Sequence, residues 1–236
     1  MTTTSAASTA ERRPAASRTA FGLFTALSMT VGRGPAARMV ADMAALTSSD
    51  RVVDIGCGPG TAVRVAARRC ASVTGVDPAP EMLRLGRWIT ARQHLSNAAF
   101  RAGAAEALPL ADASVTVAWA LSSVHHWPDR AAGLAEAARV LTPAGRLLLV
   151  ERLVRPGARG HAAHGVTKEQ AAQLTAELEA AGFGAVSCRT RQAGHRTLAI
   201  VTAALPGAAG PDRAVLPARG RAAPGIQPRR PRRCRR

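Results

Sequence analysis

The sequence predicts an α/β fold, a doubly wound and mostly parallel seven-stranded sheet that ends in a C-terminal antiparallel hairpin. Two observations support this. Short apolar segments alternate with helix-forming stretches through most of the 236 residues, a pattern typical of a parallel sheet covered by helices on both faces. The last two strand candidates are separated only by a short turn, so they are expected to pair antiparallel. A chain of this length accommodates one full domain.

The predicted elements follow one another in the order that this fold requires. Residues 34–46 carry apolar side chains at helical spacing, and a polar turn at residues 48–50 precedes the first strand. A late helix begins at Thr167 and ends before Gly182. The strand candidates are residues 52–55, 73–76, 98–101, 115–119, 146–150, 185–190 and 197–203. Further helices are predicted from about residue 61, from about residue 81 and over residues 129–141.

Both ends of the chain differ in composition from its centre. Residues 1–18 are small and polar without periodicity, and residues 206–236 are rich in arginine and proline. Both segments are expected to be disordered. The folded domain is therefore predicted over residues 19–205.

The formal net charge of +17 is concentrated at the same two ends. Residues 206–236 hold nine arginines against Asp212 alone, and residues 1–20 add a net charge of +2. The centre of the chain is only mildly basic, so the total charge does not by itself indicate a nucleic-acid-binding domain. Arginine supplies every basic residue except Lys168, a bias that a GC-rich genome would also produce.

Neither the cysteines nor the apolar segment near the N-terminus indicates secretion. The cysteines are scattered without a CxxC pair, so no disulfide framework and no metal site are predicted. Residues 21–31 resemble the apolar part of a signal peptide, but Gly, Thr and Ser interrupt them, and a bilayer span needs about 20 apolar residues. A helix lying against the domain or its ligand is the preferred interpretation. The expected location is the cytoplasm, with no membrane span.

A glycine-rich loop follows the first strand in the stretch Gly56-Cys-Gly-Pro-Gly60. Glycines at the junction of a strand and a helix let a ligand approach main-chain N–H groups that side chains would otherwise cover. Asp77 ends the second strand about 20 residues further on, where a carboxylate can accept both hydroxyls of a ribose. The two features together predict a ligand that contains adenosine.

The details of the loop favour S-adenosylmethionine over a nicotinamide dinucleotide. The dinucleotide fingerprint G-x-G-x-x-G requires glycine or alanine where Thr61 stands, and the frame that starts at Gly58 fails at Val63. Asp54 immediately precedes the loop. A carboxylate there would repel a pyrophosphate but attract a ligand that carries an ammonium and a sulfonium group. An NAD(P)-dependent oxidoreductase is therefore the weaker alternative.

Several segments together resemble the class I S-adenosylmethionine-dependent methyltransferases, in particular the small-molecule group that is similar to the ubiquinone and menaquinone methyltransferases, with a type 11 methyltransferase domain. The resemblance implies a Rossmann-like fold and methyl transfer to a small-molecule acceptor over about residues 35–205. The segments are VVDIGCGPGT (52–61), VTGVDPAPEML (73–83), RAGAAEALPLADASVTVAWALSSVHHWPD (101–129), ARVLTPAGRLLLVE (138–151) and AAGF (180–183).

The resemblance also implies which residues hold the cofactor. The glycine loop would wrap the methionine part, Asp77 would bind the ribose, and Ala120 would face the methionine moiety. Glu106 would border the adenine, although a solvated loop glutamate is the alternative. Ala104 stands where the family often has an aspartate for the adenine amino group, so main-chain groups of the next residues would have to replace that contact. The implied set is Asp54, Gly56, Gly58, Gly60, Asp77, Pro78, Ala105, Glu106 and Ala120.

Candidate proton acceptors follow the fourth strand, in the stretch Ser122-Ser-Val-His-His-Trp127. Ligands of open α/β folds bind at the carboxyl ends of the strands, so His125 and His126 are candidate catalytic bases. Methyl transfer from a sulfonium depends mainly on positioning, and a base is needed only for a protonated acceptor. The alternative is a strand-to-helix connection in which an imidazole satisfies buried backbone groups and Asp129 caps the next helix.

The resemblance divides the domain into a cofactor-binding core over about residues 35–151, a short substrate lid over about 152–166, and a C-terminal helix and hairpin over 167–205. The lid carries His161 and His164, and an exposed connecting loop is its alternative interpretation. An RNA methyltransferase or nucleic-acid binder recruited by the arginine-rich tail is the competing function. The tail has no aromatic residue for base stacking, so an extension without a role is equally open. The sequence fixes neither the acceptor nor the oligomeric state.

Overall fold

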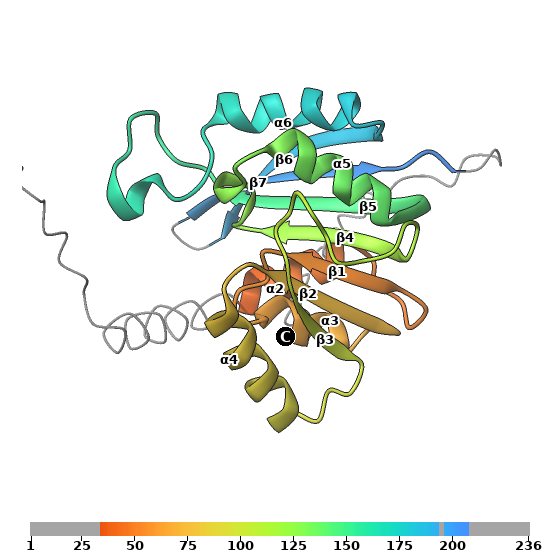
Figure 1. Ribbon diagram of the computed structural model, residues 1–236. Coiled ribbons are helices and arrows are strands. Elements are labelled where there is room, and N and C mark those ends of the chain that lie inside the picture. The colour runs from red at the N-terminus through yellow and green to blue at the C-terminus, as the bar shows by residue number, and fades with distance from the viewer. Residues whose placement is uncertain (1–33, 194–195, 208–236) are drawn as a thin grey trace, which may run out of the picture.

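The computed structural model describes residues 34–193 and 196–207, and it contains the seven-stranded sheet that the sequence predicts (Figure 1). The strand order is β3-β2-β1-β4-β5-β7-β6. Neighbouring strands from β3 to β5 run parallel, and β7 pairs antiparallel with both β5 and β6. The predicted fold class is therefore confirmed. The expectations for residues 1–18 and 21–31, and for the tail from residue 208 onward, lie outside the described residues.

Every predicted strand and helix of the described region is present. The strands are β1 (Arg51–Ile55), β2 (Ser72–Asp77), β3 (Ala98–Ala102), β4 (Val115–Leu121), β5 (Leu141–Arg152), β6 (Gly184–Ala193) and β7 (Arg196–Ala204). The α-helices are α2 (Gly34–Met43), α3 (Thr61–Ala67), α4 (Pro80–Arg92), α5 (Arg130–Val140) and α6 (Lys168–Ala180). Two short 3-10 helices, η1 (Val124–His126) and η2 (Gly160–Ala163), lie in the connections after β4 and β5.

The helix ends use the signals that the sequence contains. Asp129 caps α5 by accepting a hydrogen bond from the Ala132 N–H at 3.0 Å. Thr167 caps α6, and its side chain and that of Gln170 form a reciprocal capping box. Gly182 follows α6 with a φ of 86°, which fits its role as a stop.

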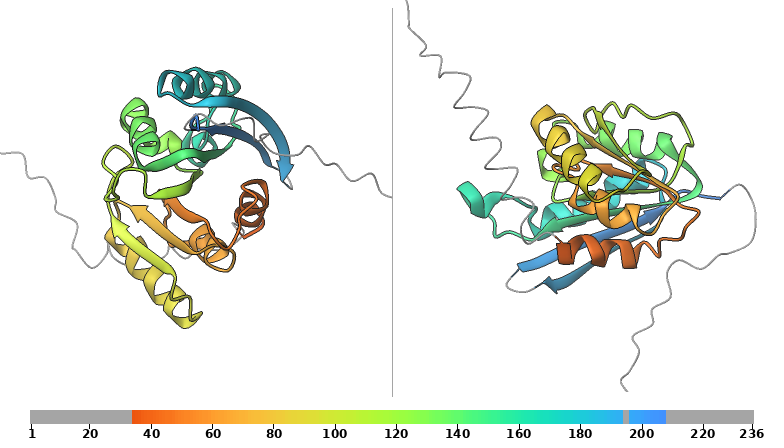
Figure 2. Two further views of the ribbon diagram at one scale, coloured as in Figure 1. Left: turned by 90° about the vertical axis from the view of Figure 1, so that its right-hand side faces the viewer. Right: turned by 90° about the horizontal axis from the view of Figure 1, so that it is seen from below.

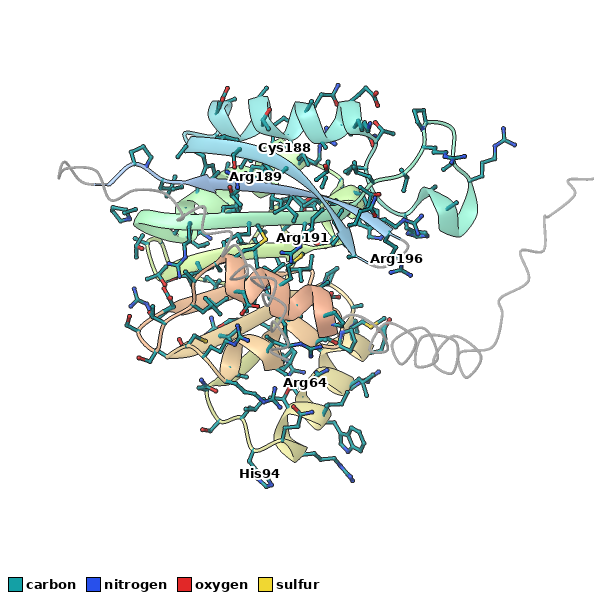
Figure 3. The ribbon with its side chains drawn as sticks, turned by 180° about the vertical axis from the view of Figure 1, so that it is seen from behind. Arg64, His94, Cys188, Arg189, Arg191 and Arg196 are labelled. Atoms are coloured by element: carbon teal, nitrogen blue, oxygen red, sulfur yellow. The ribbon has the colours of Figure 1, made fainter. Side chains whose placement is uncertain are left out.

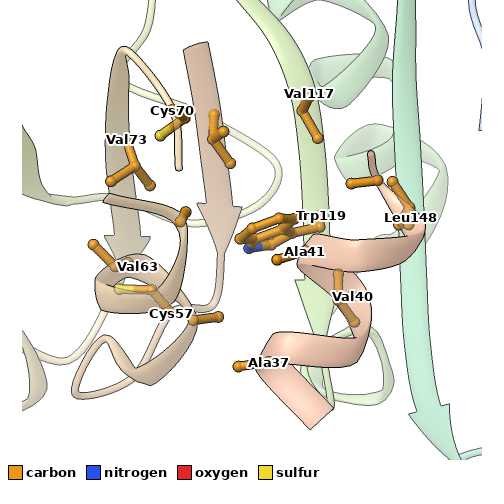
Figure 4. Close-up of a cluster of buried hydrophobic side chains, with 14 of the residues drawn as sticks. Ala37, Val40, Ala41, Cys57, Val63, Cys70, Val73, Val117, Trp119 and Leu148 are labelled. Atoms are coloured by element: carbon orange, nitrogen blue, oxygen red, sulfur yellow. The ribbon is translucent and has the colours of Figure 1, made fainter. Parts of the chain in front are cut away.

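The two faces of the sheet bury separate hydrophobic cores, because successive residues of a strand point to opposite faces. Val52 of β1 belongs to the core that α2 and α3 cover, whereas Val53 belongs to the core under α5 and α6. Figure 2 shows these two pairs of helices on opposite sides of the sheet. Figure 4 shows the first core, where Trp119 lies completely buried beside α2.

The strand β5 is longer than the sequence predicts. We expect a turn at residues 141–145 and a strand over residues 146–150, but β5 includes both and extends to Arg152. The register shifts between Val115 and Val117 of β4, whose partners on β5 are Leu141 and Arg146. Residues 142–145 of β5 therefore form an irregularity of the β-bulge type, and β4 and β5 remain paired on both sides of it. Ala144, within this irregularity, has a φ of 60°.

A buried ion pair fixes the start of the central strands. Asp50, which is 5 % exposed, accepts hydrogen bonds from Arg146 at 2.8 and 3.1 Å and from the Thr116 hydroxyl at 2.7 Å. Burial raises the pKa of Asp50, but the hydrogen bonds from Arg146, Thr47 and Thr116 outweigh it, so the pKa lies below its usual value. Among the described helices, none is long and apolar enough to cross a membrane.

Candidate active site

The glycine loop after β1 has the backbone geometry that only glycine adopts easily. Gly56, Gly58 and Gly60 all have positive φ angles, of 73°, 52° and 74°. A Cβ atom on Gly56 would collide with the Ser123 side chain, with the Ser123 Cβ at 2.6 Å, and one on Gly60 would lie 2.5 Å from the Phe100 ring. The loop therefore depends on glycine for both conformation and space, and its N–H groups bond to Val76, Asp77 and Cys57.

Asp77 lies against this loop, as the spacing of the two motifs predicts. Its Oδ2 accepts a hydrogen bond from the Gly58 N–H at 2.7 Å, and its Oδ1 accepts one from the Ala79 N–H at 2.9 Å. Each carboxylate oxygen has a second lone pair, so both remain able to accept from a ribose hydroxyl. Asp77 thus holds the loop in shape and presents acceptors beside it.

Asp54 is buried, 2 % exposed, at the end of β1 next to the loop. Burial raises the pKa of the Cys57 thiol well above its usual value, and the negative charges of Asp54 and Asp77 add to the effect. The thiol is therefore neutral, which agrees with its interpretation as a packed side chain and not as a nucleophile. Both carboxylates therefore act on the loop at Cys57, and negative charge there would suit a cationic ligand.

The remaining predicted cofactor residues occupy different environments. Ala105 is buried, and the Glu106 carboxylate accepts a hydrogen bond from the Asp129 N–H at 3.2 Å, so Glu106 has a structural contact at the start of α5. Ala120 is completely buried, and its side chain packs in the core under α5 and α6. Pro78 is exposed after β2. A cofactor contact by Ala120 would therefore use its main chain.

Arg64 of α3 supports the glycine loop, a role that we did not predict. Its guanidinium donates to the Pro59 carbonyl at 2.6 Å, and the residue is only 6 % exposed (Figure 3). Burial and the nearby Arg68 lower the pKa of Arg64 from its usual value. The contact anchors the middle of the glycine loop to the first turns of α3.

The two predicted histidines lie on η1, shortly after β4, where Glu151 contacts His125. The buried Glu151 carboxylate accepts a hydrogen bond from the Val124 N–H at 2.7 Å and one from His125 Nδ1 at 2.8 Å. With the carboxylate as acceptor, Nδ1 is the donor, so a neutral His125 ring carries its lone pair on Nε2. The contact with Glu151, 26 residues from His125 in the sequence, was not predicted.

Ser123 links the histidine segment to the glycine loop. Its hydroxyl donates to the Ile55 carbonyl at 2.8 Å and accepts from Trp127 Nε1 at 3.1 Å. Ile55 is the last residue of β1 before Gly56. The two segments that we predict for the cofactor and for the acceptor are therefore in direct contact at the carboxyl edge of the sheet.

The predicted lid is a loop whose two ends are tied together. The Val154 N–H donates to the Val166 carbonyl, and the Val166 N–H donates to the Arg152 carbonyl, both at 2.9 Å. The ring of His164, near the end of this loop, lies 5.8 Å from that of His125 and 5.4 Å from that of His126, measured between ring centroids. The structure thus brings His164 to the two predicted histidines.

A cleft of about 760 Å³ opens beside this cluster. His125 and Trp127 line it on one side, and Val154, Arg155 and Gln170 line it on the other. A second cleft of about 630 Å³ lies between α4 and β3 and contains none of the predicted site residues. Of the predicted site residues, His125 alone is among those that line the first cleft.

The sheet order β3-β2-β1-β4-β5-β7-β6 is that of the Rossmann-like methyltransferase fold. Residues 53–149 match the family model described as "Methyltransferase domain". The fold is similar to that of the YcgJ protein from Bacillus subtilis, with a TM-score of 0.60 and 18 % identity over 71 % of this chain and 97 % of that one.

Two characterised relatives match part of the chain. The 27-O-demethylrifamycin SV methyltransferase of Amycolatopsis mediterranei (strain S699) is 38 % identical over 123 residues, which are 51 % of this chain and 45 % of the relative. The demethylmenaquinone methyltransferase of Tropheryma whipplei (strain Twist) is 32 % identical over 114 residues, which are 48 % of this chain and 46 % of the relative. The chain therefore spans about half the length of the curated relatives it matches.

Proposed function

We propose that this protein transfers the methyl group of S-adenosylmethionine to a hydroxyl group of a small-molecule acceptor. The observation that carries the proposal is the His125–Glu151 pair, which lies at the carboxyl edge of the sheet beside the cleft and in contact with the glycine loop through Ser123. The relative that methylates 27-O-demethylrifamycin SV supports a small-molecule acceptor. The relative that acts on demethylmenaquinone supports the same class.

The cofactor would lie over the glycine loop. Main-chain groups of Gly56 to Gly60 would contact its methionine part, and the free lone pairs of Asp77 would accept from the ribose hydroxyls. Asp54 would contribute negative charge opposite the ammonium and sulfonium groups. Pro78, Ala105, Glu106 and the main chain of Ala120 would complete the surroundings of the cofactor.

In the proposed reaction, the acceptor oxygen attacks the methyl carbon in line with the carbon–sulfur bond. A new carbon–oxygen bond forms while the carbon–sulfur bond breaks, and the sulfur keeps the electron pair as S-adenosylhomocysteine leaves. The hydroxyl proton passes to His125 Nε2, whose lone pair is available because Glu151 holds the proton on Nδ1. His126 lies next to it as the second candidate proton acceptor, with 3.9 Å between the ring centroids.

Two measurements test the proposal. Calorimetry should detect binding of S-adenosylmethionine and S-adenosylhomocysteine to the folded full chain, and absence of binding would refute the cofactor assignment for this protein. Purified protein with a labelled methyl donor should then transfer label to a compound in fractionated metabolite pools. Label that appears only in added RNA would contradict the small-molecule acceptor and support the tail-based alternative.

The variant Glu151→Gln tests the role of the histidine. A glutamine amide would donate to His125 Nδ1 and move the ring proton to Nε2, so kcat with a hydroxyl acceptor should fall by about 10² to 10⁴. Affinity for S-adenosylhomocysteine should stay unchanged, and the assay should contain a chelator. An unchanged kcat in a folded variant would rule out His125 as the proton acceptor.

A further inference from the structure

Three histidines from two segments meet at the cleft. His125 and His126 come from η1, His164 comes from the lid loop, and one nitrogen of each ring lies within 4.8 Å of the others. His126 and His164 are exposed, and His125 is partly buried. No metal site was expected from the sequence, because its cysteines form no CxxC pair.

The buried nitrogen of this group points to a ligand. Among the described residues, His125 Nε2 has no hydrogen-bond partner, although the atom is shielded from solvent. A buried polar atom without a partner costs about 1 to 3 kcal/mol, so such atoms usually have an unseen ligand or a chemical role. Glu151 occupies the other ring nitrogen, Nδ1, so Nε2 is the nitrogen of His125 that could bind a ligand.

The contact between Glu151 and His125 is also the arrangement that prepares an imidazole for a metal. A ligating histidine generally donates its other ring N–H to a carboxylate, which fixes the tautomer and raises the basicity of the ligand nitrogen. Here Glu151 accepts from Nδ1 at 2.8 Å and is itself fixed by the Val124 N–H. Its 1 % exposure excludes competing solvent.

The backbone positions all three rings. The His126 N–H donates to the Ser123 carbonyl at 2.9 Å within η1. His164 precedes Gly165, whose φ of 146° brings the chain so close to the Arg152 carbonyl that a Cβ atom would collide with it. The paired Val166 then ties the loop to the end of β5. His164 is therefore held at the cluster by a specific turn.

We propose that His125, His126 and His164 form a site for a divalent transition-metal ion of the zinc type, with a coordination position left open toward the cleft. Three imidazoles are a ligand set that suits zinc, cobalt or nickel, and an open position is typical of catalytic sites. Metal–nitrogen distances of about 2.0 to 2.1 Å require the three nitrogens to move closer together. Metal binding would therefore draw the rings of His126 and His164 toward His125.

A bound ion would change how the acceptor loses its proton. A coordinated Nε2 cannot accept a proton, but an ion at the same place would bind the acceptor oxygen and lower its pKa. The effect of the ion on the acceptor oxygen rests on the proposed function, whereas binding of the ion by the three histidines does not. The two ideas can therefore fail separately.

Metal binding should be measured on the full chain after removal of bound ions with a chelator. The parent protein for these measurements carries Cys188→Ser and Cys234→Ser. Titration with ZnCl₂ in a calorimeter should give one equivalent of zinc per chain. Mass spectrometry after gel filtration counts the bound zinc. In the same background, His164→Ala should weaken zinc binding by at least about 100-fold, and Glu151→Gln should weaken it by about 10 to 100-fold. His94→Ala, which removes an exposed histidine beyond α4, is the matched control and should bind as the parent does.

Absence of a stoichiometric zinc site, or equal binding by the His164→Ala variant and its parent, would overturn the proposal. Thermal denaturation without metal shows whether each variant is folded, and His164 is exposed, so its removal should leave the melting temperature unchanged. S-adenosylhomocysteine affinity, measured in parallel, reports on the proposed function. Retained cofactor binding together with absent zinc binding would refute the metal site alone.

Discussion

Replacing Gly56 by alanine should damage the site through the backbone, and Gly58 provides the matched control. Both glycines have positive φ angles, but a Cβ atom on Gly56 would collide with Ser123, whereas none of the described atoms lies within 4 Å of one on Gly58. Left-handed backbone costs an alanine about 1 to 2 kcal/mol, and this cost applies to both variants. The difference between them therefore isolates the collision.

The collision has a calculable cost because Ser123 is buried and makes two hydrogen bonds. Displacing it weakens its contacts with the Ile55 carbonyl and with Trp127 Nε1, each worth about 0.5 to 1.5 kcal/mol. Gly56→Ala should thus lower the free energy of unfolding by about 2 to 5 kcal/mol, and Gly58→Ala by about 1 to 2 kcal/mol.

Urea denaturation followed by circular dichroism measures both values, provided that the m-values agree. Equal destabilisation by the two variants would refute the contact between the glycine loop and Ser123. Greater destabilisation by Gly58→Ala would refute the loop geometry altogether.

Three further predictions concern other parts of the molecule. Asp77→Ala should weaken S-adenosylhomocysteine binding by about 1 to 3 kcal/mol, roughly 5 to 150-fold in the calorimetric Kd, and unchanged affinity would exclude its ribose role. Asp50→Asn should lower the free energy of unfolding at pH 7 by about 2 to 4 kcal/mol, because it breaks a largely buried pair with Arg146. Since the pKa of Asp50 is lowered on folding, its contribution is present above its usual value of 3.8 and lost as the pH falls through the folded pKa. Acid denaturation curves should therefore lose this component in Asp50→Asn, and identical pH dependence in the two proteins would count against it. Truncation after Leu205 should reduce the salt-dependent binding of RNA if the tail recruits nucleic acid, whereas equal RNA binding by both proteins would remove the tail from that function.

The sequence predicted the arrangement of those segments of the candidate site that are local in the chain. The glycine loop directly follows its strand in the sequence. The number of residues between Gly56 and Asp77 is that of one strand–helix–strand unit. His125 and His126 were predicted as candidate catalytic bases because they follow β4 in the sequence. These features depend on short-range order, and the structure places them at the same edge of the sheet.

The parts that the sequence did not predict depend on contacts between distant segments. Glu151 pairs with His125 because β4 and β5 are neighbours with matching ends, and their register was unknown beforehand. His164 reaches the cluster only because its loop is tied to the end of β5. The extension of β5 back to Leu141 likewise depends on its pairing with β4, which local turn residues do not reveal.

The tied base of the loop after β5 has a consequence for how acceptor specificity can change. Backbone hydrogen bonds from Val154 to Val166 and from Val166 to Arg152 close the base of the segment between Val154 and Val166. Because loop-closure entropy grows only slowly with length, that segment can be lengthened or exchanged at little cost to stability. Segments grafted from other proteins between these two anchors should therefore reshape the cleft while the cofactor loop keeps its geometry, which makes this region an interchangeable module for engineering.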